Sequence, residues 1–329
     1  MNFLNKLQIT KDFSIPKEKF DLQSHSYFSD GRKSPEDLLH SAHNNGYKYI
    51  SITDHNSVQA YNQPLFELAS ELGITIIPGV ELECFGELDV LAFDSQENSI
   101  SPEFSNEIAK VTKFISEKRN KYLQEGIDNI VDFLKSSSNI PWVKWGKKDQ
   151  EKKNEIISAL TIKNASNINL DTAKLENFNR EYISKPHLAM LLARFDLVDL
   201  TLFASTFSIP IEKAPKYAMG MLFDKYIKWP LDGLKPDNEI IEMVSKIPFV
   251  KVIAHPGKSF EIQQKENQDL AFGKYVQYLL DSGLDGAEID YRNYKNTDAN
   301  YNEKTTDILI KQQRTMYGTG GSDTHNLFT

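Results

Sequence analysis

The chain has 329 residues, of which 40% are hydrophobic and 26% are charged, so it can bury a large core and has the composition of an ordinary folded protein. Its net charge of −8 (38 Lys and Arg against 46 Asp and Glu) argues against broad electrostatic binding to duplex DNA, which needs many cationic contacts to phosphates. One cysteine, Cys84, excludes an internal disulfide and a multi-cysteine zinc site. The lack of a secretory signal and of ~18 consecutive apolar residues predicts a cytoplasmic protein that does not enter membranes.

The first hundred residues alternate between strand and helix patterns. A helix begins where Ser34 can cap the first turn and Pro35 can open it, and it ends near Gly46. A second helix is predicted at 62–72. Strands are predicted at 19–25, 47–53, 74–83 and 87–93.

From about residue 100 the pattern becomes mostly helical and rich in Lys, Asn and Glu, up to about residue 235. The alternation then resumes, with helices at 237–246, near 267–283 and near 298–314, and strands at 249–255, 285–290 and 315–325. We therefore expect an α/β fold in which residues 1–99 and 237–329 form one discontinuous domain. Residues 100–236 would be a helical insertion, because candidate ligands occur on both sides of it.

Histidines and carboxylates follow these strand-like runs from one end of the chain to the other. They are His25, Asp30, His55, Glu81, His255, Asp323 and His325. A barrel that gathers strand ends onto one face would bring them together. Clustered imidazoles and carboxylates without cysteine are ligands for Zn²⁺, Mn²⁺ or Fe²⁺. His40 and His43, three residues apart on one predicted helix, are expected to face solvent instead. Asp54 is equally compatible with a supporting role and with simple turn chemistry.

The same residues stand in short motifs that resemble, in order, those of the PHP (polymerase and histidinol phosphatase) family. The motifs are DLQSH (21–25), SDG (29–31), TDH (53–55), GVE (79–81), HPG (255–257) and SDTH (322–325). The resemblance implies a distorted seven-stranded (β/α) barrel with an inserted helical subdomain. A weaker match, SKPHLAMLLARFDLV (184–198), is similar to a subgroup that acts on nucleoside 3′,5′-bisphosphates and on the 5′ ends of short RNAs.

Carried over position by position, the resemblance implies three neighbouring metal sites. The first takes Gln23, His25, Glu81 and Asp323; the second takes Glu81, Asp89 and His255; the third takes Asp30, His55 and His325. The family usually has histidine at the positions of Gln23 and Asp89. Carboxylates also bind these metals, so Asp89 is a plausible replacement, whereas the neutral amide of Gln23 is a weaker ligand than an imidazole. We therefore expect two or three divalent ions, Mn, Fe or Zn, with Mg also compatible.

The resemblance implies a metal-dependent phosphoric ester hydrolase that uses metal-activated hydroxide to attack phosphorus. Its substrate would be a small phosphorylated molecule, a nucleoside 3′,5′-bisphosphate or the 5′ end of a short oligonucleotide, and not an extended duplex. The sequence does not indicate an oligomeric state. Catalytic roles would go to Glu81, His255 and Asp323, and substrate phosphate binding to Lys185, His187, Arg194 and Lys258.

Two alternatives remain open at this point. In the first, the chain is a partly degenerate PHP module with a structural or binding role, a reading that Gln23 favours. In the second, the enzyme is retained but acts on a monoester that resembles histidinol phosphate. Fold-level analogy is weak support for any one substrate, so the substrate class depends on the motif at 184–198 and on the insertion.

Overall fold

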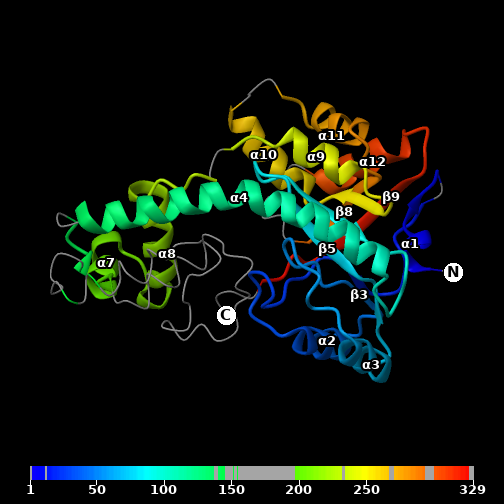
Figure 1. Cartoon of the computed structure of the whole chain (residues 1–329), viewed down its shortest axis with the longest axis horizontal. Helices are drawn as coiled ribbons and strands as arrows, with labels where there is room; N and C mark the ends of the chain where they lie inside the picture. The colour runs from blue at the N-terminus through cyan, green and yellow to red at the C-terminus, as the bar shows by residue number, and fades with distance from the viewer. Residues whose placement is uncertain are drawn as a thin grey trace. The chain divides into compact units, whose positions relative to one another are not determined.

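The computed structural model describes residues 2–11, 13–136, 140–144, 151, 154, 197–231, 234–266, 270–292 and 300–325. The chain divides into two compact units (Figure 1). The first contains Met1–Ser116 and Leu234–Leu327, and the second contains Glu117–Gly233 and Phe328–Thr329. The expected limits of the insertion, residues 100 and 236, stay predictions.

The first unit is an α/β unit, as predicted, with two sheets. The larger sheet has the order β1-β9-β8-β7-β6-β5, and the smaller has the order β2-β3-β4. The larger contains β1 (Gln8–Ile9), β5 (Gly79–Glu83), β6 (Asp89–Phe93), β7 (Val250–Ile253), β8 (Gly286–Tyr291) and β9 (Met316–Gly321). The smaller contains β2 (Phe20–Asp21), β3 (Tyr49–Ile50) and β4 (Thr75–Ile76).

The strand directions depart from a simple parallel barrel. β7, β8 and β9 are parallel, whereas β6 is antiparallel to both β5 and β7. Single bridges link the two sheets: Ser24, after β2, pairs with Thr324, after β9, and His55, after β3, pairs with Glu81 of β5. In the described ranges, therefore, the ladders form two open sheets, and a closed seven-stranded barrel is not recorded among them.

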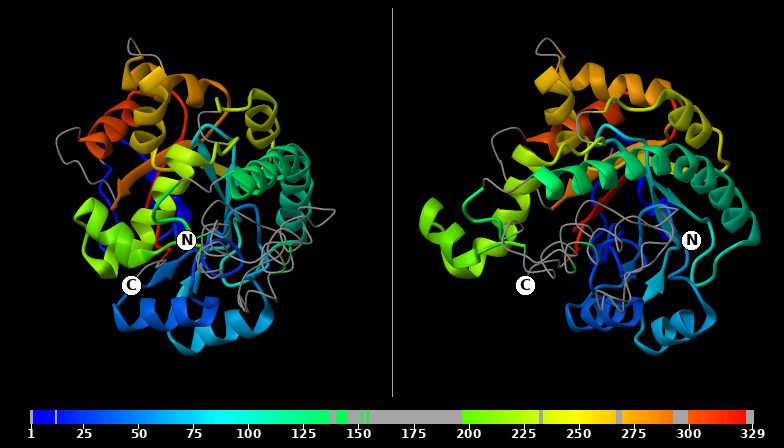
Figure 2. Two further views of the ribbon diagram at one scale, coloured as in Figure 1. Left: turned by 90° about the vertical axis from the view of Figure 1, so that its left-hand side faces the viewer. Right: turned by 60° about the vertical axis from the view of Figure 1, so that its left-hand side comes forward.

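Helices of the first unit cover the sheets. They are α1 (Phe3–Lys6), α2 (Pro35–Asn44), α3 (Gln63–Glu71), α9 (Asn238–Ser245), α10 (Pro256–Glu266), α11 (Phe272–Asp281) and α12 (Tyr301–Ile310). α2 and α3 lie side by side (Figure 2). The Oγ of Ser34 accepts a hydrogen bond from the N–H of Asp37 at 3.0 Å, which confirms the predicted start of α2. α10 was not predicted, and because it occupies 256–266, the next helix begins at Phe272 rather than near residue 267.

Two hydrophobic cores fix these elements. One packs α2 and α3 against the small sheet through Leu39, Ile52 and Leu65, all fully buried. The other joins α1 to both sheets, and Phe93 of β6 is fully buried in it. Burial of such side chains contributes about 1.5–3 kcal/mol each, so the strand ends that carry the candidate ligands are held by well-packed cores.

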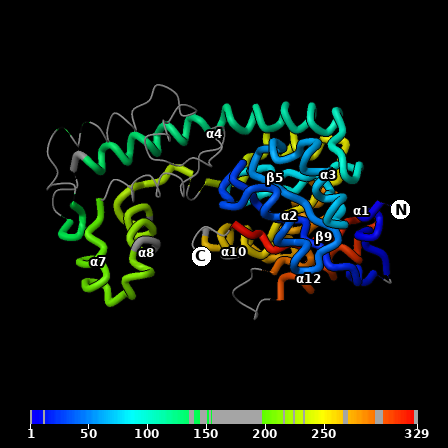
Figure 3. Tube along the Cα trace, turned by 90° about the horizontal axis from the view of Figure 1, so that it is seen from below, coloured from blue at the N-terminus to red at the C-terminus, as the bar shows by residue number. Residues whose placement is uncertain are grey.

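The second unit is helical where it is described. It contains the later part of α4 (Pro102–Ser136), then α7 (Leu200–Phe207), the short η5 (Ile211–Lys213), α8 (Ala214–Met221) and the π-helical turn η6 (Leu222–Tyr226). α7 and α8 lie side by side (Figures 1 and 3). The α4 backbone approaches Trp229 so closely that a Cβ on Gly126 would come within 2.3 Å of its ring, which explains the glycine.

Among the described residues, none of the helices combines the length and the apolar character needed to cross a lipid bilayer.

Candidate metal centre

The predicted ligands of the first unit meet at one place, although they are spread over three hundred residues of sequence. His25 follows β2, His55 follows β3, and His255 follows β7. Glu81 lies inside β5, and Asp323 follows β9. All eight firm ligand candidates take part in one network of short contacts: His25, Asp30, His55, Glu81, Asp89, His255, Asp323 and His325.

The turn that carries Asp30 is shaped by a buried carboxylate. Asp54 accepts hydrogen bonds from the N–H of Ser26 at 2.7 Å and from the hydroxyls of Ser26 and Ser29, each at 2.6 Å. Gly31 closes the turn, because a Cβ there would come within 2.1 Å of the carbonyl oxygen of His25. The tight turn brings the Asp30 carboxylate next to the His25 ring. Asp54 thus has a supporting role, one of the two alternatives that the sequence left open.

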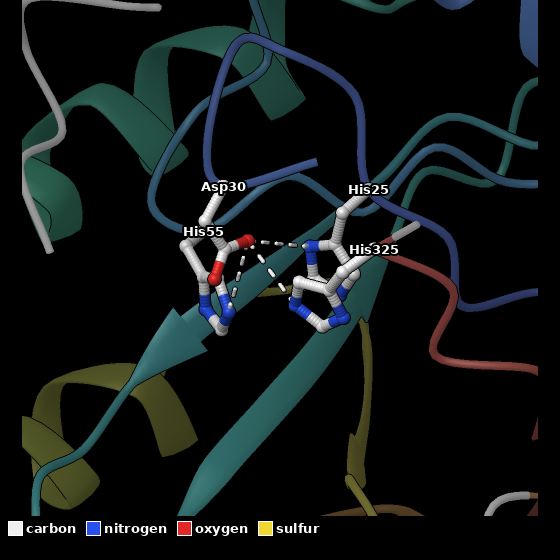
Figure 4. A group of neighbouring side chains, drawn as sticks. All are labelled: His25, Asp30, His55 and His325. Carbon is white, nitrogen blue, oxygen red and sulfur yellow. Dashed lines mark ion pairs between the residues drawn. The ribbon is translucent and has the colours of Figure 1, made fainter. Parts of the chain in front are cut away.

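Asp30 faces three imidazole rings (Figure 4). Its Oδ1 lies 3.1 Å from Nε2 of His325, 3.8 Å from Nδ1 of His25 and 3.8 Å from Nε2 of His55. One ligand atom from each of the four residues lies within 4.8 Å of the others, a spacing that could hold a metal ion. The three residues predicted for the third site are therefore together, and His25 joins them.

Glu81 lies at the middle of the network. Its Oε2 is 3.0 Å from Nε2 of His25, and its Oε1 is 3.2 Å from Nε2 of His255. The same His25 nitrogen is 3.2 Å from Oδ1 of Asp323. His25, Glu81 and Asp323 form a second group of the right spacing for a metal ion, and all three are buried.

Asp89 reaches the site because β6 is antiparallel. It is the first residue of β6 and pairs with Glu83, the last residue of β5, so it lies at the edge where β5 ends. Its Oδ2 is 3.6 Å from Nε2 of His255. Asp89, Glu81 and His55 form a third group that could hold a metal ion. The predicted second site paired Asp89 and Glu81 with His255, which is close to both.

Gln23 is fully buried beside the network, and its side-chain amide is used as a donor. Its Nε2 donates to Oε1 of Glu81 at 2.9 Å, and its Oε1 has no hydrogen-bond partner among the described residues. Gly321 passes so close that a Cβ there would lie 2.5 Å from the Cβ of Gln23. Gln23 thus orients Glu81.

Burial and the imidazoles pull the pKa values of the carboxylates in opposite directions. Burial alone would raise the pKa of Asp30, but His55 and the other rings hold it far below its ordinary range. The pKa of Glu81 is lowered in the same way, chiefly by His55 and His25. Burial and the nearby Glu81 raise the pKa of Asp89 well above its ordinary value. Burial lowers the pKa of His25, but its carboxylate partners raise it well above the usual value. The site is therefore strongly charged and largely shielded from solvent.

The donor set fits divalent cations. Several buried atoms make no hydrogen bond of good geometry among the described residues, although some of them lie close to one another. They are both ring nitrogens of His25, Oδ1 of Asp30, Oε2 of Glu81 and Nδ1 of His255. Unsatisfied buried polar atoms are costly. Imidazole nitrogens and carboxylate oxygens are what Zn²⁺, Mn²⁺ and Fe²⁺ bind, so cations at these positions would satisfy them.

Two ligands are presented by unusual backbone conformations. His255 has a φ of 29° and Asp323 has a φ of 48°. Both values lie in the left-handed region of backbone conformation, which residues other than glycine rarely adopt. Such conformations cost of order 1–3 kcal/mol and are concentrated at functional sites.

One of the four predicted phosphate-binding residues can be placed. Lys258 lies in the first turn of α10, partly buried. Burial lowers the pKa of Lys258, but the nearby Asp323 and Asp89 raise it by more. The net shift is upward, so the lysine is charged. Lys185, His187 and Arg194 lie outside the described residues. His40 and His43 are exposed on α2, as expected.

Two residues that the sequence did not single out as ligands support the centre from β8. The hydroxyl of Tyr291 donates to Oδ2 of Asp323 at 2.8 Å. Oε2 of Glu288 accepts the backbone N–H of His255 at 2.7 Å. Tyr291 gave no sequence signal, because a tyrosine at a strand end is ordinary. Glu288 was recognisable only as a carboxylate in a predicted strand that also contains Asp290.

Comparison with known proteins adds a family match. The PHP domain model matches residues 21–192, just over half of the chain. A 5′-3′ exoribonuclease from Haemophilus influenzae is 30% identical over 124 residues, which cover 36% of this chain and 45% of that protein. The 5′-3′ exoribonuclease Rnm from Salmonella typhimurium is 38% identical over 69 residues, 21% of this chain and 24% of that protein. The matches thus span less than half the length of these curated relatives.

Two solved structures share the fold across nearly the whole chain. One, from Bifidobacterium adolescentis, is of a protein inferred to be a metal-dependent phosphoesterase; it has a TM-score of 0.56 and 20% identity, and covers 96% of this chain and 91% of its own. The other is an amidohydrolase from Chromobacterium violaceum with bound sulfate and no metal; it has a TM-score of 0.56 and 18% identity, and covers 93% of this chain and 87% of its own. At these identities the likeness establishes the fold.

Proposed function

Because the chain belongs to the PHP domain family, we propose that it is a metal-dependent hydrolase that cleaves a phosphoester bond in a small nucleotide or at the end of a short oligonucleotide. The observation that carries the proposal is the convergence of four imidazoles and four carboxylates on one buried place. A merely structural network would leave fewer of these atoms without partners.

The residues would divide among neighbouring cations. Asp30, His55 and His325, with His25, would hold one ion; His25, Glu81 and Asp323 a second; Glu81, Asp89 and His255 a third. When bound, such cations lower the pKa of water toward ~7 and neutralise charge on phosphoryl oxygens. Metal identity is left to measurement, because this mixed ligand set suits Mn²⁺, Fe²⁺ and Zn²⁺ alike, with Mg²⁺ also compatible.

The chain's own groups would orient and accept protons. Glu81 directs its two oxygens toward His25 and His255, so one carboxylate can serve two cations. Asp323 and His255 are the candidate groups for proton transfer, each through the oxygen or ring nitrogen that does not hold a cation. Lys258 would attract an anionic substrate to this strongly acidic centre, because its charge lies within electrostatic range of Asp323 and Asp89.

Support for a nucleotide substrate comes from the two relatives named as 5′-3′ exoribonucleases. We assign the second phosphate of a bisphosphate to Lys258 together with Lys185, His187 and Arg194. The same proposal treats residues 100–236 as the insertion that carries three of these four residues. It also treats β2, β3 and β5 to β9 as the seven strands of a distorted barrel, a reading supported by the two single bridges between the sheets.

The test is hydrolysis by the metal-loaded protein. A nucleoside 3′,5′-bisphosphate should release phosphate, and a 5′-phosphorylated oligoribonucleotide should release mononucleotides, with Mn²⁺, Fe²⁺ or Zn²⁺. Asp30→Asn should abolish both reactions, whereas His43→Gln on the exposed side of α2 should leave both unchanged. Absence of release with all three metals, from a protein that binds them, would remove the proposal.

A monoester arm separates the substrate classes. If a histidinol-phosphate-like monoester is hydrolysed faster than the bisphosphate, the nucleotide assignment is wrong and the hydrolase assignment stands. Lys258→Ala should slow the bisphosphate reaction more than the monoester reaction, because only the bisphosphate has a second phosphate to bind.

One observation favours a different function, that of a partly degenerate module. The side-chain amide of Gln23 donates a hydrogen bond to Glu81, and this position has no imidazole that could bind a cation. Elemental analysis after metal repletion discriminates between the two: less than one ion per chain supports a structural or binding module, and two or more support the hydrolase.

A further inference from the structure

β8 supplies none of the candidate ligands. It lies between β7 and β9, the two strands that are followed by the ligands with left-handed backbone conformations, His255 and Asp323. It pairs in parallel with β7, which ends two residues before His255, and with β9, which ends two residues before Asp323. These two are the only predicted ligands in the described residues with positive φ, 29° and 48°. A backbone held in this region needs surrounding contacts that over-determine it.

An irregularity in β8 re-aims its side chains. Glu288 pairs with Thr319 and Asp290 pairs with Gly320, so Ile289 is an extra residue opposite β9. In a regular strand, residues 288 and 291 would point to opposite faces. A bulge shifts this alternation, and bulges are common next to active sites. As a result, both Glu288 and Tyr291 reach the metal centre.

Each of the two side chains makes a hydrogen bond to one ligand residue. The fully buried Glu288 accepts the backbone N–H of His255 through Oε2 at 2.7 Å. The hydroxyl of Tyr291 donates to Oδ2 of Asp323 at 2.8 Å, which leaves Oδ1 facing Nε2 of His25 at 3.2 Å. The ring of Tyr291 also packs edge-on against the His255 ring, with 5.5 Å between centroids.

The end of β8 is itself tied down. The N–H of Tyr291 donates to Oδ1 of Asn302 on α12 at 3.3 Å, and Nδ2 of Asn302 donates to the carbonyl of Tyr291 at 3.1 Å. The N–H of Arg292 donates to the carbonyl of Gly321 at 3.2 Å. Tyr291 is therefore placed by α12 and β9 independently of its bond to Asp323.

We propose that Glu288 and Tyr291 are positioning residues that hold His255 and Asp323 in their left-handed turns with their ligand atoms facing the cations. The bulge at Ile289 is the structural device that allows one strand to contact both. This inference rests on the proposed metal-dependent function, because it concerns how the ligands are aimed. Supporting groups of this kind typically change metal affinity 10–100-fold when removed.

The test uses three variants and a matched control in the full chain. Glu288→Met removes the acceptor at similar length, whereas Glu288→Gln keeps an oxygen that can accept the His255 N–H. Tyr291→Phe removes one hydroxyl. Tyr317→Phe is the control: it removes a tyrosine hydroxyl from β9 that bonds Gln8, on the same sheet but outside the metal network. Dissociation constants for Mn²⁺ and Zn²⁺ are measured by titration calorimetry, and unfolding of the metal-free proteins by circular dichroism.

Glu288→Met and Tyr291→Phe should each weaken metal binding about 10–100-fold, while Glu288→Gln and Tyr317→Phe bind nearly as wild type. The inference is overturned if Tyr291→Phe binds as wild type, or if Glu288→Gln loses as much affinity as Glu288→Met. Should Glu288→Met fail to fold, the comparison of Tyr291→Phe with Tyr317→Phe still decides. Wild-type protein that binds no metal would overturn both this inference and the proposed function, whereas normal metal binding without hydrolysis would overturn the function alone.

Discussion

Replacing Gln23 by histidine tests which features of the metal centre come from this one side chain. Gln23 is fully buried and donates to Oε1 of Glu81 at 2.9 Å. A hydrogen bond to a charged group contributes about 1.5–3 kcal/mol. An imidazole N–H can keep that bond, and the close contact with Gly321 involves the Cβ, which both residues have. The free energy of unfolding of metal-free Gln23→His should therefore stay within ~1 kcal/mol of wild type.

Metal binding should change much more than stability. Imidazole nitrogen suits Zn²⁺ and Fe²⁺, whereas an amide oxygen is a weak, neutral ligand better suited to Mg²⁺ or Mn²⁺. We expect Gln23→His to bind Zn²⁺ at the site of His25, Glu81 and Asp323 at least about tenfold more tightly, which is ~1.4 kcal/mol. The increase should be smaller for Mn²⁺, because its preference for imidazole is weaker.

The assay is zinc per chain and zinc affinity, by elemental analysis and calorimetry, on protein first stripped with a chelator. Gln23→Leu is the matched control, because it removes the donor to Glu81 without adding a ligand. Equal zinc binding by wild type and Gln23→His would show that position 23 does not face a cation. An equal rise in Gln23→Leu would show that releasing Glu81, rather than adding an imidazole, causes the change.

Three further predictions follow from the buried groups. Asp54→Ala leaves three buried donors on Ser26 and Ser29 without their acceptor, so urea unfolding should show a loss of about 3 kcal/mol or more, with a smaller loss for Asp54→Asn; an unchanged midpoint for Asp54→Ala would contradict this. Stripping the metal should lower thermal stability, and restoring Mn²⁺ at about 100 times its Kd should return ~2.7 kcal/mol; no shift on repletion would mean that no cation binds the folded state. Burial, reinforced by Asp89, raises the pKa of the Cys84 thiol, which therefore stays neutral at pH 8. A thiol reagent should label Cys84 only after the protein unfolds, and rapid labelling of the folded protein would refute this assignment.

The order of motifs along the chain predicted which side chains would meet, because several of the motifs follow a strand whose position is fixed by burial. Ile50 and Ile52 are buried in one core, and that burial places His55 at the centre. The same pattern placed His255 after a buried strand. Hydrophobic periodicity identifies such strands well, so their end residues are predictable even when the strand partners are not.

Strand direction and register could not be predicted from the same pattern. Asp89 was a plausible ligand only by resemblance, and it reaches the centre because β6 is antiparallel, a property that its own residues do not encode. The run 74–83 was expected as one strand, but Pro78 lies between two short ones, since proline has no N–H for the ladder. α10 was missed because its first residues, Pro256 and Gly257, are typical of a turn; proline is nonetheless favoured at the first position of a helix.

The charge balance of this cluster favours the binding of cations. With its imidazoles neutral, the network would place several carboxylates in a site with little solvent, an arrangement that is strongly unfavourable. The raised pKa values of His25 and of Asp89 offset this charge, because both groups then hold a proton more readily. Divalent cations relieve the same charge at the same atoms, and ligands must lose protons to bind them. Protons and cations therefore compete for one set of buried groups. Because the pKa of His25 is raised, this competition extends to pH values above those at which histidine ordinarily loses its proton.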